Sequence, residues 1–484
     1  MILEDEGRII LSIIITLACF IGVIILIITE RLNRAVAALI GAVIVYFTLT
    51  FLEGMDFKVI LELLFGSEAE GFVNLHSLIL IIAMMFIVQI SNEAGLFQFF
   101  ALNLIKFSKG KPLYLMSIFC FITILISSVL NNILTVIILI PLTITVSRIL
   151  NVNPSPYILT QAILVNIGGT FFTISSIPNI LISNYAEIQF IDFFLNVGTT
   201  SLIIFVFTLL FFIFIYKKSL EIPQEGIKIL KEFNVWNFVP NKNLLLKSLI
   251  SLIVLFFLFI IIPTSLLGAD IIALIIALVL ILISRIEVKE IFSKIDFELI
   301  FYLLGIFVIA GGLEVLKVVQ FLGEAMANLS GGDIFSQLLI ILWVSAFLSS
   351  AIDNIPITKV LIPVVGTITA SYPSSIGDQF YYSLAVGANW GDNLTPLGDN
   401  ILVVQLAEAN KRPISFKQFF KIGFITTLYQ LTIVTIYYTL IFNFPVGIIV
   451  IILISSILII FFILKRIGNK IIESIINKFR NIFI

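Results

Sequence analysis

A polar island interrupts one of the most apolar parts of the sequence. The stretch LSSAIDNIPITKVLIPVV, residues 348–365, holds Asp353, Asn354 and Lys359 inside a run that is otherwise hydrophobic. A charged side chain at the centre of a bilayer costs at least about 2.5–3.5 kcal/mol on insertion scales, so it needs a function or a partner. Carboxylate, amide and ammonium groups at this depth are suited to holding an ion or a polar solute.

An earlier stretch, ISSVLNNILTVIILIPLT at residues 126–143, repeats the pattern without a gap. Its two asparagines, Asn131 and Asn132, stand at the positions of the later Asp-Asn pair, and Ser127 stands at the position of Ser349. The charges are confined to the later copy. The two stretches therefore predict one scaffold that is used twice, with chemistry that differs between the copies.

A second pair of motifs follows the first pair at nearly the same distance. Asn166 opens NIGGTFFTISSIPN, and Asn389 opens NWGDNLTPLGDN. From Asn132 to Asn166 is 34 positions, and from Asn354 to Asn389 is 35. Glycine and proline interrupt helices, and unwound backbone survives at membrane depth only inside protein or beside water. Each copy therefore predicts one interrupted hairpin followed by one broken membrane span.

The composition places these motifs in a membrane. Apolar residues make up 60% of the 484-residue chain and charged residues 12%, against about 45–50% and about 25% in soluble domains. The net charge of −1 argues against nucleic acid as a partner. Two cysteines in apolar runs and a single histidine argue against a disulfide framework or a metal cluster.

Apolar windows long enough to span a bilayer as helices recur along the chain. If the two interrupted segments are re-entrant hairpins and the N-terminus lies outside, all but four of the 28 Lys and Arg residues fall on the cytoplasmic side. Two full crossings per segment would give the same sidedness, whereas one crossing would not. The expected spans lie near 9–29, 35–52, 77–97, 157–185, 194–216, 248–263, 269–284, 299–316, 380–405, 424–443 and 446–464, with interrupted segments at 113–147 and 335–370.

The two hairpins then have opposite orientations. The predicted fold is an all-α polytopic membrane protein with an inverted-topology repeat, two re-entrant hairpins and two broken transmembrane helices. We expect a plasma-membrane protein with its N-terminus outside and its C-terminus in the cytoplasm. The expected parts are a first half at 1–216, a cytoplasmic loop at 217–247, a second half at 248–443, and an extra span with a basic tail at 444–484.

The strongest candidates for coupling to sodium or protons are three aspartates of the second half, Asp353, Asp392 and Asp399. Carboxylates in a membrane segment mark ion pathways and proton relays. The competing interpretation is that they cap the half-helices at the breaks, because Asp and Asn are favoured N-caps.

Two further features also allow two interpretations. Lys359 either pairs with a carboxylate or contacts an anionic solute. Gly168 and Gly169 either permit close helix packing or belong to a binding site with the Asn, Thr and Ser residues around them. The clustered polar residues favour binding.

Four segments resemble hallmarks of a known superfamily: SSVLNN, SSAIDNIP, NIGGT…PN, and IDFELIFYLLGIFVIAGGLE at residues 295–314. This is the ion-transporter superfamily of arsenite permeases, one type of sodium–proton antiporter, and citrate and dicarboxylate symporters. The resemblance covers about residues 9–443. Members similar to the dicarboxylate symporters carry Ser-Asn-Thr at both tips, which this chain lacks, and Asp392 stands where the family often has glycine. The arsenite-permease and antiporter branches therefore look closest.

The resemblance implies a scaffold domain and a transport domain, with hairpin tips and helix breaks meeting at the substrate site. It also implies a homodimer. The implied ion- or substrate-binding residues are Ser127, Asn131, Asn132, Asn166, Gly168, Gly169, Thr170, Ser349, Asp353, Asn354, Asn389, Gly391, Asp392, Asn393 and Thr395. The expected sodium ligands are Asn131, Asn166, Asp353 and Asn389, and the coupling or charge-pairing candidates are Asp353, Asp392, Asp399 and Lys359.

The function that these observations predict is secondary active transport of a small ion or polar solute, coupled to Na⁺ or H⁺. Sodium–proton antiport or transport of arsenite and other inorganic ions is favoured. The alternatives are a citrate- or dicarboxylate-type symporter and, from another class, a channel or a non-transporting scaffold. The chain has neither a G-x-x-x-x-G-K-[ST] phosphate loop nor a Ser-His-Asp arrangement, so we expect no enzyme activity and no cofactor besides bound sodium.

Overall fold

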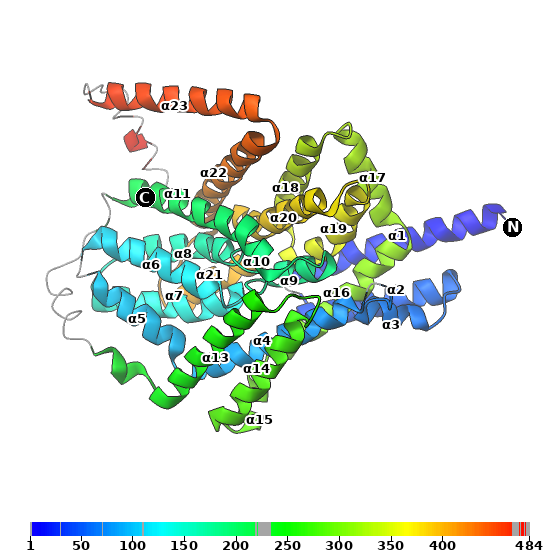
Figure 1. Cartoon of the computed structure of the whole chain (residues 1–484), viewed down its shortest axis with the longest axis horizontal. Helices are drawn as coiled ribbons and strands as arrows, with labels where there is room; N and C mark the ends of the chain where they lie inside the picture. The colour runs from blue at the N-terminus through cyan, green and yellow to red at the C-terminus, as the bar shows by residue number, and fades with distance from the viewer. Residues whose placement is uncertain are drawn as a thin grey trace.

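The computed structural model describes the chain except residues 1, 30, 70, 109–110, 218–219, 221–233, 467–473, 475, 479 and 481–484. Every regular element in the described part is a helix (Figure 1). Nine of the described helices are long and apolar enough to cross a membrane, and further shorter helices are also apolar. The predicted all-α polytopic architecture is confirmed.

The first half contains two N-terminal helices, a hairpin and a broken span. Its elements are α1 (Ile2–Ile28), α2 (Arg34–Phe47), η1 (Thr48–Leu52), α3 (Lys58–Phe65), α4 (Val73–Glu93), α5 (Leu96–Phe107), α6 (Pro112–Ser127), α7 (Asn132–Ile149), α8 (Ser155–Gly168), α9 (Ile177–Tyr185), α10 (Phe190–Phe193), η2 (Phe194–Gly198) and α11 (Thr199–Tyr216).

The second half has the same order of elements. They are η3 (Val235–Phe238), α13 (Lys242–Ile261), α14 (Ala269–Ser284), α15 (Val288–Ser293), α16 (Phe297–Val315), α17 (Val318–Leu329), α18 (Ile334–Ala351), α19 (Asn354–Thr369), α20 (Ser374–Gly391), η4 (Asp392–Leu394), η5 (Gly398–Asn400), α21 (Ile401–Ala409) and α22 (Phe416–Phe442), followed by α23 (Phe444–Arg466). Much of the expected loop at 217–247 and of the tail after 466 lies outside the described residues.

The helix breaks fall at the predicted motifs. One hairpin turns between α6 and α7, after Ser127, and the other turns between α18 and α19, after Ala351. α8 ends at Gly168 and α20 ends at Gly391, and in both cases a short irregular segment precedes the next helix. Each hairpin arm has 16 to 18 residues and is therefore about 24 to 27 Å long, slightly shorter than the hydrocarbon core of a bilayer.

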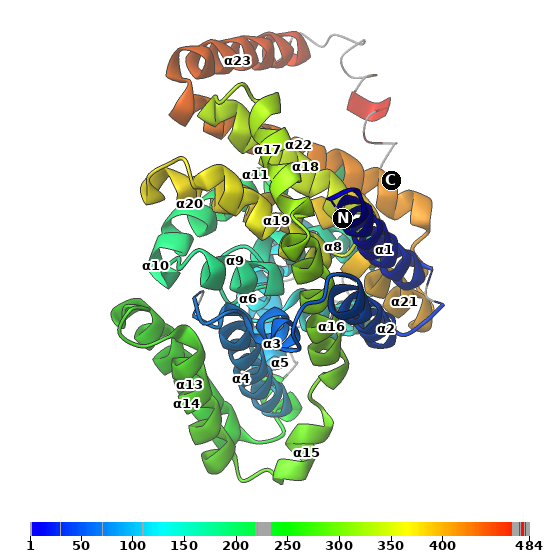
Figure 2. The same cartoon turned by 90° about the vertical axis from the view of Figure 1, so that its right-hand side faces the viewer.

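The two halves interlock through two pairs of helices (Figure 2). α2 of the first half packs along α16 of the second, and α14 of the second half packs along α4 of the first. The contact between α2 and α16 is close, because a Cβ on Gly305 would lie 2.7 Å from the Cβ of Ala38. The predicted halves, 1–216 and 248–443, therefore contact each other through one helix pair at each side.

Several short helices were not predicted, among them α3, α5 and α17. α5 and α17 each connect a long helix to a hairpin, so they occupy equivalent places in the two halves. Both carry apolar residues at helical spacing, but they are too short to span a membrane. α23 packs against α22 and lies at one edge of the molecule (Figure 1).

Candidate functional site

A serine at equivalent positions fastens each hairpin to the broken helix beside it. Ser127 donates through Oγ to the carbonyl of Val165 at 2.6 Å, and Ser349 donates to the carbonyl of Ala388 at 2.6 Å. Each accepting carbonyl belongs to the residue immediately before the asparagine that opens the second motif. The two hairpins are thus held in the same way at the same place.

Side-chain amides satisfy the unwound backbone at both breaks. Asn179 donates to the carbonyl of Gly169 at 2.8 Å, and Asn400 donates to the carbonyl of Asp392 at 2.9 Å. A carbonyl freed from a helix must find a partner when water is absent. The equivalence of Gly169 and Asp392, inferred from the motif spacing, therefore holds in the hydrogen bonding as well.

Short hydroxyl side chains add a second tie at each break. Ser175 donates to the carbonyl of Ser128, and Thr395 donates to the carbonyl of Ser350, both at 2.6 Å. The hairpin tip and the break of the following span are therefore joined into one unit in each half.

A buried network of amides and one carboxylate joins the two halves. Asn132 donates to Oδ1 of Asn166 at 2.6 Å, and Asn166 donates to Oδ1 of Asn393 at 2.8 Å and to Oδ2 of Asp392 at 3.2 Å. Asn400 also donates to Oδ2 of Asp392 at 3.2 Å. Asn132 is 4% exposed and the others are 3% or less. We call these five residues the amide cluster.

Two further contacts between the halves lie beside the amide cluster. Asn389 donates to Oδ1 of Asn179 at 2.9 Å, and Trp390 donates through Nε1 to Oγ1 of Thr170 at 3.0 Å. All four side chains are completely buried. Asn166 and Asn389, which open the two motifs, therefore each bind a residue of the opposite half.

Two buried oxygen atoms here have no hydrogen-bond donor among the described residues: Oδ1 of Asn132 and Oδ1 of Asn389. A buried acceptor without a partner costs about 1–3 kcal/mol. Oδ1 of Asn132 also lies against Gly169, where an added Cβ would be 2.6 Å from it. Both oxygens are chemically suited to a small cation.

The tips of the two hairpins converge on a small cavity of about 20 Å³. It is lined by Asn131 and Asn132 from one tip, Asn354 from the other, and Ser176 and Pro178 at the start of α9. Such a volume holds about one water molecule or one small ion. Asn131 itself caps α7, because its Oδ1 accepts from the N–H of Leu134 at 2.9 Å.

Asp353 lies on a cavity of about 530 Å³ that Arg34 and Glu298 also line, and that reaches Ile133 and Gly398 beside the amide cluster. Its Oδ1 accepts from the N–H of Ile355 at 3.2 Å, and its Oδ2 accepts from the hydroxyl of Tyr302 at 3.2 Å. Asp353 is thus a helix cap that also faces a cavity, so the two interpretations of this residue do not exclude each other.

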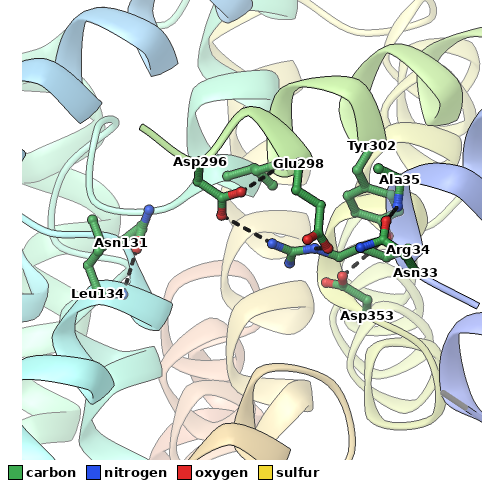
Figure 3. A network of polar contacts seen from close by, with 10 residues as sticks. Asn33, Arg34, Ala35, Asn131, Leu134, Asp296, Glu298, Tyr302 and Asp353 are labelled. Atoms are coloured by element: carbon green, nitrogen blue, oxygen red, sulfur yellow. Dashed lines mark hydrogen bonds and ion pairs between the residues drawn. The ribbon is translucent and has the colours of Figure 1, made fainter. Parts of the chain in front are cut away.

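Arg34 was not predicted as a site residue. Its guanidinium binds Asp296 through Nη2 at 3.2 Å and Glu298 through Nε at 3.1 Å. In Figure 3 its side chain passes between Glu298 and Asp353, and it also lies over the ring of Tyr302. The sequence contains no local signal for this arrangement, because Arg34 lies more than 260 positions away from the two acids that it binds.

Lys359 lies on a different cavity from Asp353. Its Nζ donates to Oδ1 of Asn74 at 2.7 Å and sits 5.1 Å from the ring centre of Phe307. Glu62 and Glu314 line the same cavity, which measures about 220 Å³. The structure therefore does not place Lys359 beside Asp353, although it does place carboxylates near the ammonium group.

The expected sodium ligands do not form one group. Asn166 and Asn389 lie at the contact between the halves, whereas Asn131 faces the tip cavity and Asp353 faces the large cavity. The described residues contain no group of three His, Cys, Asp or Glu side chains that could hold a metal ion. The side chain of Asp399 lies outside the described part of the chain.

The glycines of the two second motifs have a packing role. A Cβ on Gly168 would lie 2.7 Å from the Cβ of Ser127, and one on Gly391 would overlap the backbone of Ala346. Close helix packing therefore explains Gly168 and Gly391. The residues that sequence reasoning left out of the site, Asn179 and Asn400, close both second motifs, and this position is the signal that would have found them.

Comparison with known proteins agrees with this architecture. The family model described as citrate transporter matches residues 24–387 and 267–476. A 46 kDa membrane protein of Mycobacterium leprae is 30% identical over 88% of this chain and 97% of its own length. An uncharacterized transporter of Mycobacterium tuberculosis is 29% identical with the same coverage.

A more distant relative is the P protein of Homo sapiens, which is 24% identical over 87% of this chain and 59% of its own length. The comparisons do not show the arsenite-permease branch that the motifs favoured. The buried breaks, the apolar helices and the family match together identify the chain as an integral membrane transporter that belongs to the citrate transporter family.

Proposed function

We propose that this protein is a secondary active transporter in which the amide cluster and its surroundings bind the coupling cation. The observation that carries the proposal is the pair of buried oxygens without donors, Oδ1 of Asn132 and Oδ1 of Asn389, beside the buried carboxylate of Asp392. These acceptors come from both halves of the chain. A bound cation would therefore stabilise the contact between the halves.

Sodium and protons would use these groups differently. Sodium prefers oxygen ligands, and the orphan amide oxygens, the carboxylate of Asp392 and backbone carbonyls of the breaks are all oxygens. A proton would instead bind the carboxylate of Asp392 and neutralise it. In both cases the cation changes the charge of the buried contact, and this couples its binding to movement of the halves relative to each other.

The test is flux into proteoliposomes that contain the purified full-length protein. An imposed sodium or pH gradient is combined with a panel of solutes, including citrate and arsenite. Uptake that depends on one of the gradients supports a secondary transporter. Uptake that follows only the solute's own gradient at channel-like rates, or no uptake of any solute, would refute it.

A citrate-type symporter is the second candidate, because the matched family is described as citrate transporter. The same panel separates it from sodium–proton antiport and from transport of inorganic ions such as arsenite. A homodimer, a location in the plasma membrane and an external N-terminus also belong to this proposal. Cross-linking in the membrane and labelling of single cysteines from each side would test them.

A further inference from the structure

The two hairpins are anchored in the same way, but their tips make different contacts. In each half a serine fastens the hairpin at 2.6 Å, and the tip asparagine follows five residues after this serine. In the first half the tip asparagine, Asn132, donates to Oδ1 of Asn166 at 2.6 Å. The repeat therefore predicts an equivalent bond in the second half, from Asn354 to Oδ1 of Asn389.

The described residues do not form this second bond, although its donor and its acceptor are both present. Oδ1 of Asn389 is buried and has no donor among the residues that the structure describes. The side chain of Asn354 likewise has no hydrogen bond within the described chain, although Asn354 is only 2% exposed. Both residues lie near the start of α9, because Asn354 lines the tip cavity with Pro178 and Asn389 binds the next residue, Asn179.

The backbone of the second tip is wound differently from that of the first. α6 ends at Ser127, and residues 128–131 connect it to α7. α18 continues past the equivalent residue, Ser349, as far as Ala351, and residues 352–353 alone lead to α19. The number of residues from serine to asparagine is the same in both hairpins. A longer helical arm and a shorter connection must therefore place the second asparagine differently.

Hydrogen bonds to helices outside the hairpin hold the second tip. Asp353, the last residue before α19, accepts through Oδ2 from the hydroxyl of Tyr302 on α16 at 3.2 Å (Figure 3). Further along α19, Lys359 donates to Oδ1 of Asn74 on α4 at 2.7 Å. At the first tip, the side chain of Asn131 accepts from a backbone N–H of its own helix. The second tip is therefore bound to α16, whereas the first tip is bound to its own broken helix.

The bond to Tyr302 and the missing bond to Asn389 have opposing effects of similar size. A hydroxyl that donates to a carboxylate forms a stronger bond than two neutral groups do. A buried acceptor without a donor is costly, so a donor for Oδ1 of Asn389 would also be favourable. Asp353 faces the large cavity, where water can replace the hydroxyl of Tyr302. The tip can therefore exchange one of these bonds for the other at a small cost.

We propose that Tyr302 is a positioning residue that holds the second hairpin tip open, and that the tip closes when Asn354 donates to Oδ1 of Asn389. The closed tip repeats the bond that Asn132 already makes to Asn166 in the first half. An amide oxygen has two lone pairs, so Oδ1 of Asn389 can accept this bond and still coordinate a cation. The closure goes beyond the proposed function, because it concerns the hairpin and holds for any solute.

The experiment measures how fast Hg²⁺ bridges a pair of cysteines at each tip of the full-length protein in proteoliposomes. The pair at the second tip is Asn354→Cys with Asn389→Cys, and the matched pair at the first tip is Asn132→Cys with Asn166→Cys. The two native cysteines, both buried, are replaced by Ala. Intact-mass spectrometry identifies a bridged pair, because it retains one Hg²⁺ and no longer reacts with maleimide. We expect the first pair to be bridged at least about tenfold faster than the second.

Variants that release the second tip from α16 should accelerate bridging at that tip alone. Tyr302→Phe deletes the hydroxyl, and Asp353→Ser keeps an N-cap but is too short to reach the hydroxyl. Each should raise the bridging rate of the second pair at least about tenfold and leave the first pair unchanged. Asp353→Asn is the matched control, because its amide oxygen can still accept from Tyr302, so the second pair should stay slow.

Three results would overturn this proposal. Equal bridging rates of the two pairs with Tyr302 present would show that the second tip is not held open. A second pair that stays slow in both Tyr302→Phe and Asp353→Ser would remove Tyr302 from the positioning of the tip. Equal acceleration in Asp353→Ser and Asp353→Asn would assign the effect to the carboxylate charge instead. The measurement needs no transported solute, so its failure and the failure of the proposed function are separate results.

Discussion

The two helix breaks share one backbone plan and differ in charge. In both, an asparagine donates to the carbonyl of the equivalent residue, Gly169 in the first half and Asp392 in the second. In both, a serine fastens the neighbouring hairpin at 2.6 Å. Only the second break carries a carboxylate at its centre. The hairpins differ in the same way, because Asp353 and Lys359 have the uncharged counterparts Asn131 and Ile137.

This difference separates what holds the fold from what performs chemistry. Bonds present in both halves serve the architecture, since they recur where the charges do not. Charged groups present in one half only are the candidates for coupling. The comparison thus ranks residues by their expected effect on transport without knowledge of the substrate. It makes one prediction for the charged residues and another for the residues that hold the backbone.

The largest effect is expected for Asp392→Asn, which removes the carboxylate that distinguishes the second break. Hydrogen bonds to charged groups contribute about 1.5–3 kcal/mol, so the affinity for the coupling cation should fall about tenfold to 100-fold. Gradient-driven uptake should be lost, while the amide oxygen can still accept from Asn166 and Asn400. The measurement is the sodium and pH dependence of flux in proteoliposomes.

The control for this variant is Asp333→Asn. Asp333 caps α18 at an exposed position, and Asn caps a helix about as well as Asp. Its flux should be unchanged. Normal cation dependence in Asp392→Asn would remove this carboxylate from the mechanism and make the two breaks functionally alike.

The second-largest effect distinguishes the two asparagine side chains that donate to backbone carbonyls at the helix breaks. Asn179→Ala and Asn400→Ala each leave a buried carbonyl without its donor, so each should lower the free energy of unfolding by about 1–3 kcal/mol. Only Asn400 also donates to the carboxylate of Asp392. We therefore expect a larger change of cation dependence in Asn400→Ala than in Asn179→Ala, which loses only the contact with Asn389. Equal changes in both would mean that the first break takes part in coupling.

A smaller and symmetric effect is expected at the serines that fasten the hairpins. Ser127→Ala and Ser349→Ala each delete one buried hydrogen bond, which contributes about 1 kcal/mol. Thermal unfolding in detergent should show similar losses in both. Ser456→Ala, whose hydroxyl binds within its own exposed helix, should show none. A large loss in one hairpin alone would contradict the shared plan.

The smallest effect is expected for His76→Gln, which alters the polar contact between the starts of α4 and α14. His76 binds Asp270 through Nδ1 at 2.8 Å, and its side chain is 46% exposed. Asp270 itself is buried, but the amide of Gln at position 76 can still donate to its carboxylate, so the loss should be no more than about 1 kcal/mol. The counterpart of this contact at the start of α2 and α16 joins Arg34 to two carboxylates, so Arg34→Gln should destabilise the protein more. The reverse order, measured by thermal unfolding, would overturn this ranking.

The breaks and hairpins could be predicted because Gly, Pro and Asn act locally. These residues weaken a helix where they cluster, so their spacing locates Gly168, Gly391 and the two tips. The equivalence of Asn132 and Asn354 also followed from spacing alone. The amide cluster was partly predicted for the same reason, since Asn166, Asp392 and Asn393 belong to these motifs.

The partners of the charged residues could not be predicted, because they depend on contacts between distant segments. Asp353 meets Tyr302, and Lys359 meets Asn74, which lies 285 positions away. The sequence did indicate that the side chains of Asp353 and Lys359 point in different directions. Six residues at about 100° each place two side chains about 120° apart around a helix, so they should not share one face.

The interlocking of α2 with α16 and of α4 with α14 has a consequence for biosynthesis. α2 is made more than 250 residues before the helix that covers its small-residue face, at Ala37, Ala38 and Gly41. Until α16 has been translated and inserted, that face must be shielded by lipid or by the insertion machinery. Neither half can complete its packing alone, so maturation ends with a post-insertion assembly step that joins helices made at the beginning and in the middle of synthesis.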